Sequence, residues 1–259
     1  MIAVGVDCGA KTVKVVILKD GQVVGRSLVL AGIDTKVSAD EAFDEALGIA
    51  GLIKSDVGNI VATGAGKKEI TYAKDTITEV AATSKGAVYL NPAVRTVIDV
   101  GAEEGRAIKV DESGRVVDFA INEKCAAGAG AFTEAMARAL EVKIEEMGTL
   151  SLQSTQAVPM NAQCAVFAES ELVTLVHSKI PKPDMARAIH DAIADRIISM
   201  VRRVGIEKEI MLIGGVAHNI GFVVSLNRGL DLDVEVIVPE APEYVGALGA
   251  ALAAASKPR

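Results

Sequence analysis

The pattern of apolar and polar positions contains two matching segments built from short apolar runs and glycine turns. Residues 4–24 contain an apolar run, an Asp-x-Gly-Ala turn, a second apolar run, an Asp-Gly turn and a third apolar stretch. Residues 96–117 repeat this order, with the Asp-x-Gly-Ala turn at 99–102 and a Ser-Gly turn at 113–114. Apolar runs bounded by glycine turns are typical of β-strands joined as hairpins. The repeat predicts two lobes that each open with three consecutive strands.

Outside these segments the apolar residues recur every three or four positions, which is typical of amphipathic helices. The pattern predicts helices at residues 39–53, 80–88, 131–140, 166–177, 185–204 and 246–255, and strands at 59–63, 209–213 and 233–238. We therefore expect an α/β fold with an N-terminal lobe at residues 1–93 and a C-terminal lobe at 94–259. The last helix consists mostly of small residues, so it is expected to pack closely, back on the N-terminal lobe.

Composition narrows the class of protein. The chain has 259 residues, half of them apolar but only 3% aromatic, with no tryptophan, which excludes disordered, collagen-like and disulfide-scaffold proteins. Its 34 acidic and 27 basic residues give a net charge of -7, which argues against a nucleic-acid-binding surface. No apolar run reaches the length of about 18 residues that a membrane-spanning helix needs. We expect a soluble, cytoplasmic protein that binds neither nucleic acid nor a membrane.

The paired Asp-x-Gly turns suit a phosphate site. Such a turn places a carboxylate beside backbone N–H groups, and glycine has no Cβ to obstruct a phosphate. One such turn is usually an ordinary hairpin turn, but two equivalent copies favour a clamp for nucleotide phosphates and Mg²⁺. Residues 213–219 form a strand that ends in Gly-Gly and opens a helix, which suits a nucleoside. A fourth glycine turn follows the strand predicted before residue 64.

Together these turns resemble the superfamily of acetate and sugar kinases, heat-shock-70 chaperones and actin, whose two ribonuclease-H-like lobes close on ATP. The resemblance covers nearly the whole chain and implies ATP and Mg²⁺ in the cleft between the lobes. By position, the first turn contributes Asp7, Gly9, Ala10, Lys11 and Thr12, the second Asp99, Gly101, Ala102 and Glu103, and the Gly-Gly turn Gly214, Gly215 and Asn219. The resemblance implies that Asp7, Asp99 and Glu103 take part in catalysis and that the others bind the nucleotide.

Two of the three cysteines each precede a predicted helix. A thiolate at a helix N-terminus is stabilised by the helix dipole and by free N–H groups, which also favour an anionic metal cluster. The ordinary alternative is a small buried side chain. Cys125 and Cys164 provide too few thiolates in one chain for a four-ligand centre, whereas two chains around a two-fold axis would complete a 4Fe-4S cluster. Cys8 is interpreted as a packed thiol, and the three histidines show no metal-ligand spacing.

The two cysteine segments, at residues 124–130 and 164–171, resemble those of the ATPase family that comprises activators of 2-hydroxyacyl-CoA dehydratases and ATPase subunits of benzoyl-CoA reductases. The resemblance implies an ATPase that passes electrons from a 4Fe-4S cluster, bridging a homodimer or a heterodimer with a paralogue, to a CoA-ester-reducing partner. Ferredoxin or flavodoxin would supply the electrons. Glu103 stands where the dehydratase activators usually have glutamine. The Gly-Ala-Glu-Glu-Gly turn at residues 101–105, with the Asn-Glu-Lys-Cys sequence at 122–125, resembles the benzoyl-CoA reductase subunit more than a dehydratase activator. The alternatives are a dehydratase activator and a small-molecule kinase of the same superfamily.

Overall fold

The computed structural model describes residues 1–122, 129–160, 164–233 and 235–257. The chain divides into two compact units, each discontinuous in sequence. The first comprises Met1–Val97, Val110–Val117 and Glu243–Arg259, and the second Ile98–Lys109 and Asp118–Pro242. The predicted lobes at 1–93 and 94–259 stay a prediction. No helix among the described residues is both long and apolar enough to cross a membrane.

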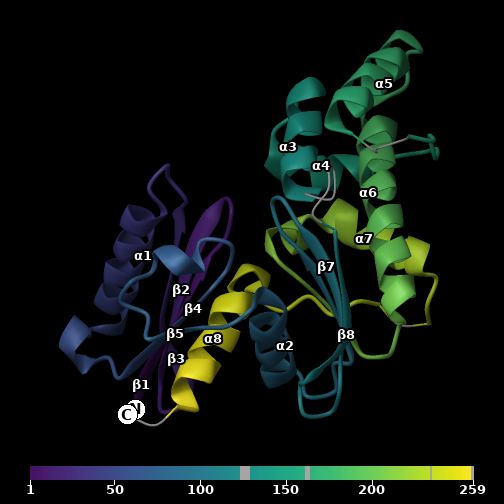
Figure 1. Cartoon of the computed structure of the whole chain (residues 1–259). Coiled ribbons are helices and arrows are strands. Elements are labelled where there is room, and N and C mark those ends of the chain that lie inside the picture. Colours follow the sequence, from purple (N-terminus) through teal and green to yellow (C-terminus); the bar gives the residue numbers. More distant parts are fainter. Residues whose placement is uncertain (123–128, 161–163, 234, 258–259) are drawn as a thin grey trace. The chain divides into compact units, whose positions relative to one another are not determined.

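The first unit contains a five-stranded sheet in the order β3-β2-β1-β4-β5 (Figure 1). Its strands are β1 (Ile2–Cys8), β2 (Thr12–Lys19), β3 (Gln22–Leu30), β4 (Asn59–Thr63) and β5 (Asp75–Thr76). β1, β2 and β3 pair antiparallel, and β4 pairs parallel with β1. The first three strands are therefore the predicted hairpins, and a parallel strand extends the sheet from the other side of β1.

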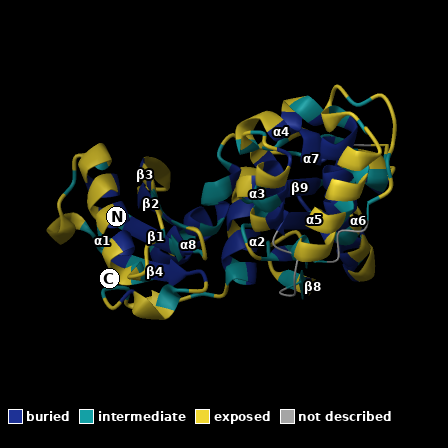
Figure 2. Ribbon diagram, turned by 90° about the horizontal axis from the view of Figure 1, so that it is seen from above, coloured by how far each residue is buried: buried dark blue, intermediate teal, exposed yellow. Residues whose placement is uncertain are grey.

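Alternation along the strands places a helix on each face of this sheet. On β2, Val13, Val15 and Ile17 pack with α1 (Thr35–Ala50), whereas Val16 and Leu18 pack with α8 (Val245–Ala255). Figure 2 shows the resulting division of α1 into a buried and an exposed face. This unit also contains α2 (Glu79–Leu90) and the short 3-10 helices η1 (Lys54–Asp56), η2 (Lys67–Glu69) and η4 (Pro242–Tyr244), the last at its boundary with the second unit.

The ends of α1 follow from local capping. Asp34 Oδ1 accepts the backbone N–H groups of Lys36 and Val37 at 3.0 and 3.2 Å, and the helix ends at Gly51, which adopts φ 65°. The helix therefore starts four residues before the predicted position and ends three residues earlier than predicted, because the cap residues outweigh the apolar spacing.

Small residues let α8 approach both the sheet and α2. A Cβ on Gly5 of β1 would lie 2.0 Å from Ala247 O, and one on Gly249 would lie 1.7 Å from Ala82 O. No side chain fits at either contact, so the backbones themselves are in contact. The predicted close packing of the last helix thus takes place within the first unit, against β1 and α2.

The second sheet has the order β8-β7-β6-β9. Its strands are β6 (Thr96–Val100), β7 (Gly105–Val110), β8 (Val116–Asn122) and β9 (Ile210–Ile213). The second unit adds α3 (Ala129–Ala139), α4 (Ile144–Ser151), α5 (Ala165–His177), α6 (Lys182–Val204), the 3-10 helix η3 (Gly215–His218) and α7 (Ile220–Leu230). α6 is the centre of its core, with Ile189, Ile193 and Ile197 almost fully buried.

The prediction of a strand at residues 233–238 is wrong, because the described residues of this segment form no continuous strand. Within the described part of this segment, Ile237 forms an isolated parallel bridge with Met211. Its N–H bonds Ile210 O at 2.8 Å, and its carbonyl accepts Leu212 N at 2.9 Å. On the side facing away from β9, the N–H of Val236 donates to Asn227 Oδ1 of α7 at 2.9 Å. Among the described residues of this segment, Ile237 alone pairs with β9.

Candidate functional site

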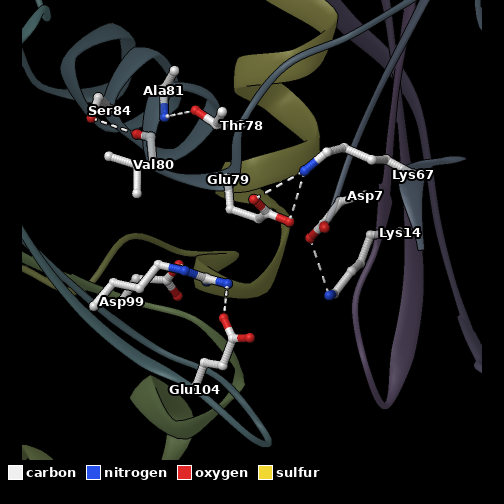
Figure 3. A network of polar contacts seen from close by, with 11 residues as sticks. Asp7, Lys14, Lys67, Thr78, Glu79, Val80, Ala81, Ser84, Asp99 and Glu104 are labelled. Atoms are coloured by element: carbon white, nitrogen blue, oxygen red, sulfur yellow. Dashed lines mark hydrogen bonds and ion pairs between the residues drawn. The ribbon is translucent and has the colours of Figure 1, made fainter. Parts of the chain in front are cut away.

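In the first unit, Asp7 lies near the end of β1 beside a tight turn. Gly9 N donates to Thr12 O at 3.1 Å and closes the turn between β1 and β2. Lys14 Nζ lies 3.2 Å from Asp7 Oδ2, and both side chains are mostly buried (Figure 3). The predicted residues Asp7, Gly9 and Thr12 are thus brought together, and Lys14 adds a counter-ion that the sequence analysis did not identify.

The second unit builds the same arrangement at the equivalent positions. Gly101 N donates to Glu104 O at 2.9 Å, and Arg106 Nη1 lies 3.0 Å from Asp99 Oδ2. Arg106 also forms an ion pair with Glu104, so its guanidinium contacts two acids. Figure 3 labels both of these acids, Asp99 and Glu104. In both units the cation follows the aspartate by seven residues, which keeps it on the neighbouring strand of the hairpin.

A glycine in left-handed conformation lies against each aspartate. Gly64 has φ 90°, and a Cβ there would lie 2.4 Å from Cys8 O and 2.7 Å from Asp7 Oδ1. Gly214 has φ 87°, and its Cβ would lie 2.3 Å from Val100 O and 2.9 Å from Asp99 Oδ1. Both the backbone angle and the lack of space require glycine. The internal repeat therefore includes the hairpin and also the glycine that follows the strand on the other side of the aspartate, β4 in the first unit and β9 in the second.

These two turns have the parts that a magnesium-bound phosphate needs. Carboxylate oxygens are ligands that Mg²⁺ prefers, glycine turns expose backbone N–H groups to phosphate oxygens, and a nearby cation offsets the charge of the acid. Other predicted residues lie at the rims of the turns: Ala10, Lys11, Glu103 and Gly215 are exposed. Ala102 is half-buried beside Gly101.

The fourth glycine turn carries an ion pair of its own. Lys67 follows Gly66 in η2, and its Nζ lies 3.2 Å from Oε1 of Glu79 at the first position of α2 (Figure 3). Both side chains are mostly buried. The turn was predicted from the sequence but the ion pair was not, because no repeat or motif in the sequence links Lys67 with Glu79.

Asn219 connects the Gly-Gly turn to two helices. Its Oδ1 accepts the N–H groups of Gly221 and Phe222 at 3.0 and 3.2 Å and so caps α7. Its Nδ2 lies 3.0 Å from Nε2 of His190, which is fully buried in α6. Burial lowers the pKa of His190 to about 4, although Asp191 acts in the opposite direction. From the sequence, this histidine shows no metal-ligand spacing, and the contact was not predicted.

The cysteines differ in their surroundings. Cys164 is the N-cap residue of α5, as expected from the sequence, and it is partly exposed. Cys125 lies outside the described residues. Cys8 is buried, and burial together with the nearby Asp7 carboxylate raises its pKa to about 12, which makes a packed, unreactive thiol. Within the described ranges, no group of three or more histidine, cysteine or acidic residues is arranged to hold a metal ion.

The signals for the missed residues differ in kind. Lys14 and Arg106 stand seven residues after Asp7 and Asp99, so aligning the two repeats further along the hairpin would have found both. Gly64 likewise corresponds to Gly214 once each is placed after the strand that pairs beside the aspartate. No comparable signal identifies His190, because its contact with Asn219 joins positions 29 residues apart.

Comparison with known proteins identifies relatives along the whole chain. The model of the BadF/BadG/BcrA/BcrD ATPase family matches residues 4–254. One of the benzoyl-CoA reductase subunits of Thauera aromatica is 34% identical over 97% of this chain and 92% of its own length.

Two solved structures, one of a dehydratase component and one of a dehydratase activator, are similar over nearly the full length. (R)-2-hydroxyglutaryl-CoA dehydratase component A of Acidaminococcus fermentans has a TM-score of 0.93 at 38% identity, covering 98% of this chain and 97% of its own. The activator of the 2-hydroxyisocaproyl-CoA dehydratase from Clostridium difficile, with bound ADPNP, has a TM-score of 0.92 at 35% identity, covering 98% and 94%.

A more distant structure supports the fold alone. A ROK family glucokinase from Streptomyces griseus has a TM-score of 0.64 at 12% identity, covering 99% of this chain and 100% of its own. With the two sheets described above, these likenesses confirm the predicted fold class of the kinase, heat-shock-70 and actin superfamily.

The buried His190 predicts a pH-dependent stability. Its pKa is about 4 in the folded chain and 6.5 in its unperturbed state, so below pH 6.5 the unfolded chain takes up a proton that the folded chain does not. The stability that the neutral His190 contributes is therefore fully present above pH 6.5 and is lost as the pH falls toward 4. Between pH 7 and 5 we expect this residue to lower the free energy of unfolding by about 2 kcal/mol. Urea unfolding should show a smaller loss for His190→Gln, and an equal loss in both proteins would contradict the assignment.

Proposed function

The chain belongs to the BadF/BadG/BcrA/BcrD ATPase family, and from this we propose that it is the ATP-hydrolysing activator of a 2-hydroxyacyl-CoA dehydratase. In this function, ATP hydrolysis drives the transfer of an electron to the dehydratase. The observation that carries the proposal is the pair of matching turns, in which Asp7 and Asp99 each lie beside a cation and a left-handed glycine. These turns supply the parts for Mg²⁺ and phosphate, and the full-length relatives supply the context.

The relatives favour an activator over the reductase component that the sequence favoured. Of the two full-length structural neighbours, the one at a TM-score of 0.93 is a component of a 2-hydroxyglutaryl-CoA dehydratase and the one at 0.92 is a dehydratase activator. The preference for a reductase component was based on the turn at residues 101–105, where Glu103 is exposed, and on the sequence of residues 122–125. A benzoyl-CoA reductase component is the second candidate, favoured by the relative at 34% identity. A small-molecule kinase has only the fold in its favour.

We assign the phosphate contacts to the first turn and the water and metal chemistry to the second. The first turn, with Gly9, Ala10, Lys11 and Thr12 beside Asp7, would bind the phosphates. In the second turn Asp99, with Gly101 and Ala102 beside it, would bind Mg²⁺. The exposed carboxylate of Glu103 would orient the attacking water, since phosphoryl transfer depends mainly on positioning and charge neutralisation. The turn at Gly214, Gly215 and Asn219 would hold the nucleoside.

The proposal includes a 4Fe-4S cluster held by Cys125 and Cys164 of two chains. The donor set fits the cofactor in type, because thiolates are the usual ligands of such clusters, and in number only if a second chain contributes. Cys164 supports this role because, as the N-cap of α5, it lies where free N–H groups stabilise negative charge. When bound, the cluster would accept one electron from a carrier such as ferredoxin or flavodoxin and pass it to the partner enzyme.

The described contacts that support a coupling between the nucleotide and the cysteines lie between the second turn and α3. The first residues of α3 donate to the second turn: Gly130 N to Gly101 O at 3.2 Å, and Ala131 N to Ala102 O at 2.9 Å. A Cβ on Gly130 would lie only 2.9 Å from Ala102 Cα. Since Cys125 stands five residues before Gly130 in the sequence, a movement of this turn would act on α3 and on the segment before it.

The first test concerns the two aspartates. Asp7→Asn and Asp99→Asn should each lower Mg²⁺-dependent phosphate release by about a hundredfold or more, because each removes charge that holds the metal and phosphates. Asp44→Asn is the matched control, since Asp44 forms an exposed ion pair with Lys54. If either Asp7→Asn or Asp99→Asn hydrolysed ATP at a rate near that of the wild type, the assignment of that turn to the ATP site would be wrong.

The second test separates the two candidate functions. Anaerobically purified protein is mixed with reduced ferredoxin, MgATP and either a 2-hydroxyacyl-CoA dehydratase or the remaining subunits of a benzoyl-CoA reductase. We expect ATP-dependent activation of the dehydratase alone. Iron and sulfide should be lost in Cys125→Ser and Cys164→Ser but kept in Cys8→Ser, because Cys8 is buried with a raised pKa. Activation of the reductase alone would establish the second candidate instead.

The third test addresses coupling. Gly130→Ala should displace α3 from the second turn, so that the number of electrons delivered per ATP hydrolysed falls about fivefold or more. Gly48→Ala is the control, because a Cβ at Gly48 meets nothing within 4 Å. If electron delivery per ATP is the same in Gly130→Ala as in the wild type, the contact between α3 and the turn does not carry the coupling.

A further inference from the structure

A fully buried histidine supports the turn that is proposed to hold the nucleoside. His190 of α6 has no solvent exposure, and its Nε2 lies 3.0 Å from Asn219 Nδ2. Its Nδ1 has no hydrogen-bond partner among the described residues. A buried polar atom without a partner normally destabilises a fold, so the imidazole must contribute something that an apolar side chain would not.

The cap of α7 fixes which way the Asn219 amide faces. Oδ1 accepts the N–H groups of both Gly221 and Phe222, and two bonds exhaust the lone pairs of an amide oxygen. Turning the amide over would put an NH₂ group against these two donors. The NH₂ group must therefore point to His190.

This orientation determines the state of the imidazole. A donor at Asn219 Nδ2 requires an acceptor at His190 Nε2, so the ring is neutral and carries its proton on Nδ1. The other neutral tautomer would place two donors 3.0 Å apart. The lowered pKa of His190 agrees with a ring that stays neutral under ordinary conditions.

The surrounding helices hold this contact without free space. A Cβ on Gly221 would lie 2.6 Å from His190 Nδ1 and 2.2 Å from Ser151 Oγ, and one on Gly148 would lie 2.8 Å from Asn219 Oδ1. Gly148 and Ser151 belong to α4, so α4, α6 and α7 converge at Asn219. The asparagine itself is only half-buried and immediately follows η3.

We propose that His190 is a positioning residue for nucleotide binding: by accepting from Asn219, it holds the segment from Gly214 to Asn219 in the conformation that receives the nucleoside. The inference rests on the proposed ATPase function. It also assigns a role to Asn219. Because both lone pairs of Oδ1 are occupied by α7, the amide oxygen is not available to accept from the base. The pair thus contributes to affinity for the nucleoside and not to the choice of base.

The tautomer is tested without any nucleotide. Nitrogen-proton NMR correlations of imidazole-labelled protein should show His190 with its proton on Nδ1. In Asn219→Asp the carboxylate keeps the cap of α7 but has no N–H to donate, so Nε2 should now carry a proton. A wild-type ring protonated on Nε2, or an unchanged ring in Asn219→Asp, would overturn the proposed contact.

The effect on binding is measured with MgADP, MgGDP and pyrophosphate. His190→Phe keeps a ring but removes the acceptor, so the Kd for MgADP should rise by about three- to tenfold, the value of one neutral hydrogen bond. The Kd for MgGDP should rise by the same factor, and pyrophosphate inhibition of the ATPase should not change. In steady state KM for ATP should rise while kcat is kept. His190→Gln, whose side-chain oxygen accepts, should recover most of the affinity.

The control is Ile193→Val, one turn along α6 and buried in the same core. It should lower the Tm and leave the Kd for MgADP unchanged. A merely structural role for His190 would give the same result in His190→Phe, and this would overturn the proposal, as would equal weakening of pyrophosphate and MgADP. If His190→Phe does not fold, the proposal is tested by the NMR comparison of the wild type with Asn219→Asp and by the Kd of His190→Gln for MgADP. If the wild type binds no MgADP, the ATPase function fails while the tautomer result stands.

Discussion

The structure depends on one repeated contact, in which a left-handed glycine crosses the end of a strand that carries an aspartate. At Gly64 and again at Gly214 the glycine lies so close to the strand-end carbonyl that a Cβ would be 2.4 or 2.3 Å from it. The same missing Cβ leaves room beside the aspartate carboxylate. This contact fixes the carboxylate, the turn that follows it and the adjoining strand, and so every candidate phosphate contact depends on it.

The two copies differ in their electrostatics. A carboxylate that is mostly buried needs a partner charge, and each unit provides one on the neighbouring strand. Lys14 gives Asp7 a single ammonium, whereas the planar guanidinium of Arg106 contacts both Asp99 and Glu104. Arg106 therefore holds the second turn through both Asp99 and Glu104, and Glu103, which lies between these two acids in the sequence, is exposed. This difference agrees with a division of labour in which the second turn presents a carboxylate to solvent water.

The sequence predicted what depends on local pattern and did less well where the outcome depends on distant partners. The hairpins, the glycine turns and the helices predicted at 80–88, 131–140, 166–177, 185–204 and 246–255 were predictable, because strand alternation, helical spacing and glycine turns are local. The short helix α4 was not predicted. The strand at 233–238 was wrong, because among its described residues Ile237 alone pairs with β9, while a side chain of α7 accepts from the N–H of Val236 on the other side. Lys14 and Arg106 were within reach of a repeat alignment, whereas the pair of His190 and Asn219 is formed only when α6 and α7 pack together.

The different helices that come after the two repeated hairpins explain how a shared nucleotide site acquires a particular task. After β3 the first unit adds the single long helix α1, which covers the sheet. After β8 the second unit adds α3 to α6, and the first residues of α3 bond directly to Gly101 and Ala102. Both cysteines of the proposed cluster belong to this longer insertion. In the proposed function, a change at the second turn would act through these backbone hydrogen bonds on a helix that has no counterpart among the described residues of the first unit. This asymmetry between the repeats is the feature that a nucleotide-driven electron transfer would require.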